Sequence, residues 1–97
     1  MNTQAILKAL NNEKRLLIVQ WLKDMKQHFP KATQTEHGIC CGLIQEKLGL
    51  SQSTVSSYLA QLERCGLLIA TRDKQWTFYQ RNEAVIQQFL GAMKMIL

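Results

Sequence analysis

Apolar residues recur along most of the chain at intervals of three and four, which is the spacing of one face of an α-helix. Two later segments are instead rich in aromatic and β-branched residues, which favour strands. The pattern predicts helices over residues 3–10, 12 to about 27, 40–48, 51–66 and 82 onward, and strands over residues 67–72 and 76–81. Asp73, Lys74 and Gln75 are expected to form the turn between the two strands.

Glycine, serine and proline mark the ends of the central helices. Pro30 ends the second helix, and Gly49 stands where a helix that closes in the left-handed conformation needs glycine. Ser51 offers a capping hydroxyl to the next helix, which ends at Gly66. A helix, a tight turn and a second helix form a helix-turn-helix. We therefore predict a mainly α fold with a two-stranded β wing, a winged helix-turn-helix, in one domain over residues 1–97.

The helix over residues 51–66 has an unusual outer face. Val55, Leu59 and Leu62 share its inner face, whereas the opposite face is small, polar and uncharged. Such a face suits close approach to base edges in a major groove, and the amide of Gln52 is the best candidate for an adenine. Basic residues of the wing could contact phosphates or the minor groove. The candidate DNA contacts are Gln52, Ser53, Thr54, Ser56, Ser57, Arg72 and Lys74.

Charge and composition agree with a nucleic-acid partner. Twelve basic and seven acidic residues give a formal charge of +5, and the hydrophobic fraction of 46% is typical of a globular protein. The chain has no apolar run long enough to cross a membrane, and residues 1–10 show no signal-peptide pattern. We expect a cytoplasmic protein whose partner is double-stranded DNA, with no membrane association.

The first and last predicted helices carry more apolar residues than a small core can absorb. Pairing these helices with their copies across a two-fold axis would bury the excess. Such a homodimer would also place two recognition helices about 34–36 Å apart, in successive major grooves. We therefore expect a homodimer through the first and last helices.

Three cysteines are the only candidates for chemistry. Cys40 and Cys41 lie at the start of a helix, where the positive end of the helix dipole favours a thiolate. A thiophilic metal, a metalloid or an oxidant could act there, although both thiols could hold one ion only if the helix begins after them, at Gly42. The alternative is that one thiol packs in the core and the other is inert. Cys65 is expected to be a small buried residue.

Several motifs resemble the arsenical-resistance repressor (ArsR/SmtB) family. The opening segment reads LNNEKRLLIVQWL, the helix-turn-helix reads LGLSQSTVSSYLAQLERCGLL, and the wing ends in the aromatic pair of RDKQWTFYQ. The resemblance covers about Leu7 to Leu90, and its SQSTVS segment is highly specific. It implies a dimeric transcriptional repressor that releases operator DNA in response to a metal ion, metalloid or oxidant.

The chain departs from that family pattern at particular positions. Tyr58 replaces a histidine of the recognition helix, and the wing tip has no glycine. Cys41 aligns with the second thiol of an arsenic-type CxC motif, but Ile39 stands at the first. The last helix offers only Glu83 toward the Asp, His and Glu ligands of a zinc-type site, so we reject that site.

Two other functions remain to be compared with an inducible repressor. The uncharged recognition helix is compatible with a winged-helix module that binds proteins without DNA, and a constitutive regulator would lack an inducer site. Arg15 could contact phosphate or brace the second helix. An enzyme is not expected, because the sequence has no Cys-x-x-Cys spacing, nucleophilic triad or phosphate-binding loop.

Overall fold

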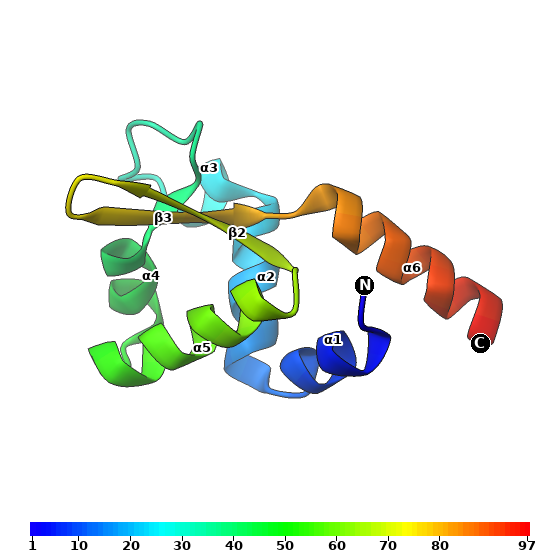
Figure 1. Ribbon diagram of the computed structural model, residues 1–97. Helices are drawn as coiled ribbons and strands as arrows, with labels where there is room; N and C mark the ends of the chain where they lie inside the picture. The colour runs from blue at the N-terminus through cyan, green and yellow to red at the C-terminus, as the bar shows by residue number, and fades with distance from the viewer.

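The computed structural model describes all 97 residues and has the expected winged helix-turn-helix architecture. Figure 1 shows a group of helices with the sheet across one side and the last helix running outward from the body. The elements are α1 (Thr3–Leu10), α2 (Glu13–Lys23), α3 (Met25–His28), β1 (Ile39–Cys40), α4 (Cys41–Leu48), α5 (Gln52–Arg64), β2 (Leu68–Asp73), β3 (Trp76–Arg81) and α6 (Glu83–Ile96). None of these helices is long and apolar enough to cross a bilayer.

The second predicted helix is divided in the structure. Asn12 caps α2 by accepting the backbone N–H groups of Lys14 and Arg15 at 2.9 and 3.0 Å. The helix was expected to reach Gln27, but it ends at Asp24, whose carboxylate accepts the N–H of Gln27 at 3.2 Å and caps the short α3. Aspartate competes in this way for nearby backbone donors, which is why it interrupts a helix that the apolar spacing alone would continue.

The helix-turn-helix forms as predicted. Gly49 closes α4 in the left-handed conformation with φ of 69°, and its N–H donates to the carbonyl of Gln45. Ser51 caps α5, because its hydroxyl accepts the N–H of Thr54 at 3.2 Å. One glycine and one serine therefore set the angle between the two helices.

The predicted hairpin is present, and a third strand that the sequence did not predict joins it. The strand order is β1-β3-β2, with every pair antiparallel. Gly38 makes this possible: its φ is 102°, and a Cβ atom there would lie 2.0 Å from the carbonyl oxygen of Tyr79. Only glycine allows the chain to approach β3 this closely, so residues 39–40 pair with it.

A cluster of 15 buried residues lies between the helices and the inner face of the sheet. The inner stripe of α5 is buried as predicted, since Val55, Leu59 and Leu62 are each at most 2% exposed. Burying such side chains stabilises each by about 1.5–3 kcal/mol relative to exposure. The position of the recognition helix is therefore set by its apolar side, which leaves the opposite side free.

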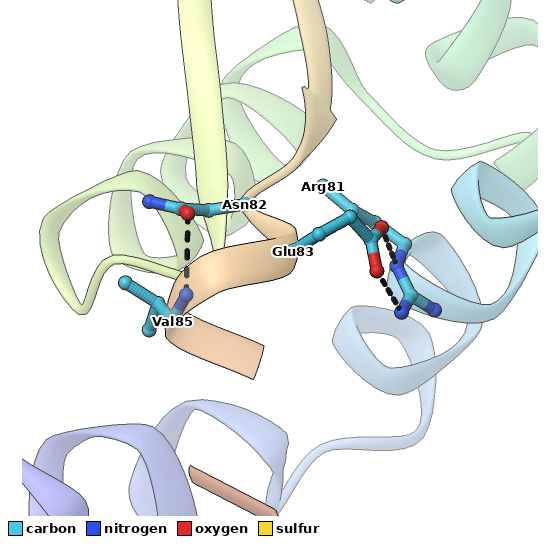
Figure 2. A network of polar contacts seen from close by, with 4 residues as sticks. All are labelled: Arg81, Asn82, Glu83 and Val85. Carbon is cyan, nitrogen blue, oxygen red and sulfur yellow. Dashed lines mark hydrogen bonds and ion pairs between the residues drawn. The ribbon is translucent and has the colours of Figure 1, made fainter. Parts of the chain in front are cut away.

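The link between β3 and α6 is fixed by polar contacts (Figure 2). Asn82 caps α6 by accepting the N–H of Val85 at 3.3 Å. Arg81 donates two hydrogen bonds to the carboxylate of Glu83, at 2.8 and 2.9 Å, and its side chain is only 12% exposed. These contacts hold the direction in which α6 leaves the sheet.

Candidate nucleic-acid interface

The outer face of α5 is open to solvent along its first two turns. Gln52, Ser53, Ser56 and Ser57 are all exposed. No ion pair or charged residue occupies this stretch, so its surface consists of hydroxyl and amide groups. Such groups can donate to or accept from base edges and phosphate oxygens. Their contact with DNA stays a prediction.

Thr54 differs from the other candidate contacts on this helix. Its side chain is half-buried, and its hydroxyl accepts a hydrogen bond from Ser51 at 2.9 Å. The Ser51 hydroxyl in turn accepts the backbone N–H of Thr54 and lies 3.3 Å from that of Ser53. Thr54 therefore belongs to the cap that positions the outer face.

The wing carries two exposed cations with different surroundings. Arg72 lies on β2 and forms a loose ion pair with Glu63 of α5, at 3.8 Å. Lys74 stands at the tip and has no ion pair. The turn is shorter than expected because Asp73 still pairs with Trp76, and Lys74 takes a left-handed φ of 59°. The tip thus presents a lysine that has no ion-pair partner.

Arg15 acts as a brace between three helices. Its Nε donates to the carbonyl of Ala9 at 2.6 Å, and its Nη2 donates to that of Lys8 at 3.3 Å, so it satisfies carbonyls at the end of α1. The guanidinium also lies over the ring of Tyr58, 5.4 Å from its centroid. Of the two roles considered from the sequence, the structure supports the brace. Tyr58, which replaces the family histidine, supplies the aromatic surface.

Sequence reasoning missed the junction at which α5 meets the sheet. Tyr79 of β3 is buried there, close to Glu63, Cys41 and Arg72. Burial raises the pKa of Tyr79 above the ordinary 10.0, Glu63 and Cys41 raise it further, and Arg72 lowers it. The one sequence feature that could have indicated this junction is Glu63, the only acidic residue of α5. The junction connects the recognition helix, the wing and α4.

The two adjacent thiols face different surroundings. Cys40 is the last residue of β1, pairs opposite Phe78, and lines a cavity of about 230 Å³ together with Leu43 of α4. Cys41 begins α4 and packs against the core. The helix therefore begins one residue too early for both thiols to hold one ion, which required a start at Gly42. No group of three or more histidine, cysteine or acidic side chains could hold a metal ion.

Cys65 closes the recognition helix. Its side chain is half-buried against the core, and its thiol donates to the carbonyl of Leu62 at 3.3 Å. The expectation that Cys65 is a small buried residue is met in part, because Cys65 is half-buried and also lines a second cavity.

Comparison with known proteins places this geometry in a family. Residues 40–70 match the family model described as "Bacterial regulatory protein, arsR family". The chain is 40% identical over 92 residues to the HTH-type transcriptional regulator YbzH of Bacillus subtilis, and the match covers 92% of each protein.

Two solved structures share the fold over almost the whole chain. HlyU from Vibrio cholerae superposes with a TM-score of 0.66 at 27% identity, covering 95% of this chain and 87% of HlyU. The repressor BigR from Xylella fastidiosa gives a TM-score of 0.62 at 26% identity, covering 94% of this chain and 78% of BigR. The chain belongs to the ArsR family of bacterial regulatory proteins and is a winged helix-turn-helix, DNA-binding transcriptional regulator.

Proposed function

We propose that residues 1–97 form a single DNA-binding domain that acts in the cytoplasm as a homodimeric repressor of operator DNA. The observation that carries the proposal is the exposed, uncharged face of α5 together with an unpaired lysine at the wing tip. The helix would read base edges while the wing supplies charge for the phosphates. The resemblance to BigR, described as a transcriptional repressor, supports the direction of regulation, whereas the relative HlyU is described as an activator.

Each candidate contact has a role in this proposal. The amide of Gln52 pairs with an adenine edge, and the hydroxyls of Ser53, Ser56 and Ser57 meet bases or phosphates. Arg72 and Lys74 contact phosphates beside the groove. Arg72 must first leave Glu63, which costs little because the pair is exposed and 3.8 Å long. Thr54 contributes by holding the start of the helix in place.

The dimer is proposed to form through α1 and α6. Apolar side chains on these helices remain in water, with Leu90 at 52%, Met95 at 86% and Ile96 at 68% exposed. Figure 1 shows α6 extending beyond the body on the side where α1 lies, and the two helices are in contact. Leu7 on α1 is exposed as well, so a second copy could cover a continuous apolar surface.

We place the inducing signal at Cys40 and Cys41. Both thiols are half-buried at the point where β1 becomes α4, so a group added to either one would displace α4 against α5. Because Cys41 packs against the core whereas Cys40 lines a cavity, oxidation or alkylation of one thiol fits the geometry better than one ion held by both. Derepression that persists unchanged in a Cys40→Ser, Cys41→Ser double variant under every oxidant and metal tested would remove this part of the proposal.

The proposal is tested by selecting bound sites from random duplex DNA with the full chain. On the selected site, Gln52→Ala is expected to weaken specific binding by about 1–3 kcal/mol, because the lost amide contacts discriminate between bases. Gln20→Ala on α2 is the matched control, since Gln20 is also an exposed helical glutamine and lies outside the proposed DNA and dimer surfaces. Affinity should fall steeply with added salt, because phosphate contacts release counterions.

The alternatives give different results in the same experiment. A protein-interaction module would select no site and would show no salt-dependent DNA affinity. A constitutive regulator would select a site but would keep its affinity after thiol oxidation. If Gln52→Ala and Gln20→Ala footprint the selected site equally well, the assignment of α5 as the reading surface is wrong.

A further inference from the structure

The largest cavity in the molecule lies between α1 and the end of α5, where Gln61 stands one helical turn beyond the proposed DNA contact Ser57. Its volume is about 390 Å³, within the usual size range of small-molecule sites. The lining residues are Ala5, Lys8, Gln61, Arg64 and Cys65. We infer that this cavity, here called the α1–α5 pocket, binds a small dianion that carries carboxylate or phosphate oxygens.

The charge of the α1–α5 pocket is the first observation behind this inference. Lys8 and Arg64 bring two cations to one cavity, and neither forms an ion pair. None of the five lining residues is acidic, and Gln61 adds an uncharged amide donor. The nearest acidic residue along the chain, Glu63, is paired with Arg72 instead. The pocket therefore presents donors and positive charge without a carboxylate to compensate them.

The side chains of Lys8 and Arg64 do not bind the carbonyl groups at the ends of α1 and α5. Basic residues in the last turn of a helix often interact with its free carbonyls. Here Arg15 already donates to the last carbonyls of α1, those of Lys8 and Ala9. At the end of α5, the carbonyl of Leu62 accepts both the N–H of Leu67, at 3.1 Å, and the thiol of Cys65, at 3.3 Å. The side chains of Lys8 and Arg64 are thus free for a ligand.

The position of the pocket leaves it open in the proposed dimer. Ala5 and Leu7 are two residues apart, so their side chains leave α1 about 200° apart. Ala5 lines the pocket on the flank that faces α5, whereas the exposed Leu7 lies on the other flank, which we assign to the partner copy. A ligand can therefore enter without separating the two copies.

An anion that contacts both Lys8 and Arg64 would tie α1 to α5. Because α1 belongs to the proposed dimer interface and α5 is the reading helix, the bound anion would fix the angle between them and change the affinity for DNA. This consequence rests on the proposed function, but the binding itself does not.

The test is an amide NMR titration of the full chain without DNA, using inorganic phosphate and succinate as probes and chloride at equal ionic strength as reference. We expect saturable shifts at Lys8, Gln61, Arg64 and Cys65. A Lys8→Gln, Arg64→Gln variant should bind about tenfold more weakly, because it loses two charged contacts that are exposed to water and therefore individually weak. Lys23→Gln, Lys26→Gln is the control, since it removes the same charge from exposed sites outside the pocket.

Each outcome separates the possibilities. Saturation by phosphate alone assigns a phosphorylated ligand, saturation by succinate alone assigns a carboxylate, and saturation by both supports the shared dianion chemistry. Shifts that grow linearly, that chloride reproduces, or that survive in the pocket variant overturn the site.

A second measurement tests the coupling to DNA. With the selected DNA, a saturating concentration of the probe should change the DNA affinity of the parent but not that of the pocket variant; an unchanged affinity of the parent would refute the coupling. A chain that binds the probe but no DNA would refute the proposed function alone.

Discussion

Arg15 provides the sharpest test of how this fold is held together. The variant Arg15→Met keeps the length of the side chain and removes the guanidinium. Its lost interactions are the charged hydrogen bond to the Ala9 carbonyl at 2.6 Å, the longer bond to the Lys8 carbonyl at 3.3 Å, and the contact with Tyr58 at 5.4 Å. A hydrogen bond to a charged group contributes about 1.5–3 kcal/mol, and an exposed cation–π contact adds about 0.5–1 kcal/mol.

Because the second bond is long and exposed, we expect Arg15→Met to lower the free energy of unfolding by about 2 kcal/mol. For a domain of this size the melting temperature should fall by roughly 8–16 °C. The assay is thermal and urea unfolding followed by circular dichroism at one fixed protein concentration, since a dimer's stability depends on concentration. Lys14→Met is the control, because it removes the same charge from the neighbouring position.

The same variant distinguishes the brace from a phosphate contact. If Arg15 is a brace, the folded variant should bind the selected DNA with the salt dependence of the parent. If it contacts a phosphate, the slope of log affinity against log salt should fall in magnitude by about one. Unchanged stability together with a reduced slope would refute the role of Arg15 as a brace.

Three further predictions follow from single side chains. Ser51→Ala should destabilise the fold by about 1 kcal/mol in urea unfolding, because the N–H of Thr54 loses its cap; a change within a few tenths would mean that the cap contributes nothing. Lys74→Gly should stabilise the fold by about 0.5 kcal/mol. Glycine relieves about 1–2 kcal/mol of strain at the left-handed φ of residue 74, and this gain exceeds the about 0.5–1 kcal/mol of extra backbone entropy that glycine loses on folding. The Lys74→Gly variant should nevertheless bind DNA more weakly, and an affinity equal to that of the parent would exclude a DNA contact at the wing tip. Tyr79 has a raised pKa in the folded state, so its contribution to stability is complete below pH 10.0 and is lost as pH rises through the folded value. Tyr79→Phe should reduce this alkaline loss of stability, whereas Tyr58→Phe should retain it; the same loss in both variants would contradict the assignment.

Local signals in the sequence were sufficient to predict the helix-turn-helix. The spacing of Val55, Leu59 and Leu62 identified the buried face of the recognition helix, and Gly49 and Ser51 identified the turn before it. Each of these signals acts within one helix or one turn, where the chain's own backbone and nearest side chains decide the conformation. For the same reason, the exposure of the neutral face could be inferred before any contact was known.

Features that depend on residues far apart in the chain were decided only by the tertiary structure. The strand at Ile39 exists because Gly38 lets the chain approach Tyr79, and a two-residue strand has no periodicity of its own. The start of α4 at Cys41 gives the adjacent thiols different surroundings, since Cys41 packs against the core and Cys40 lines a cavity, which the sequence left open. The α1–α5 pocket joins residues more than fifty positions apart, so no local pattern could place Lys8 beside Arg64. Backbone propensity acts over a few residues, whereas packing selects which distant surfaces meet.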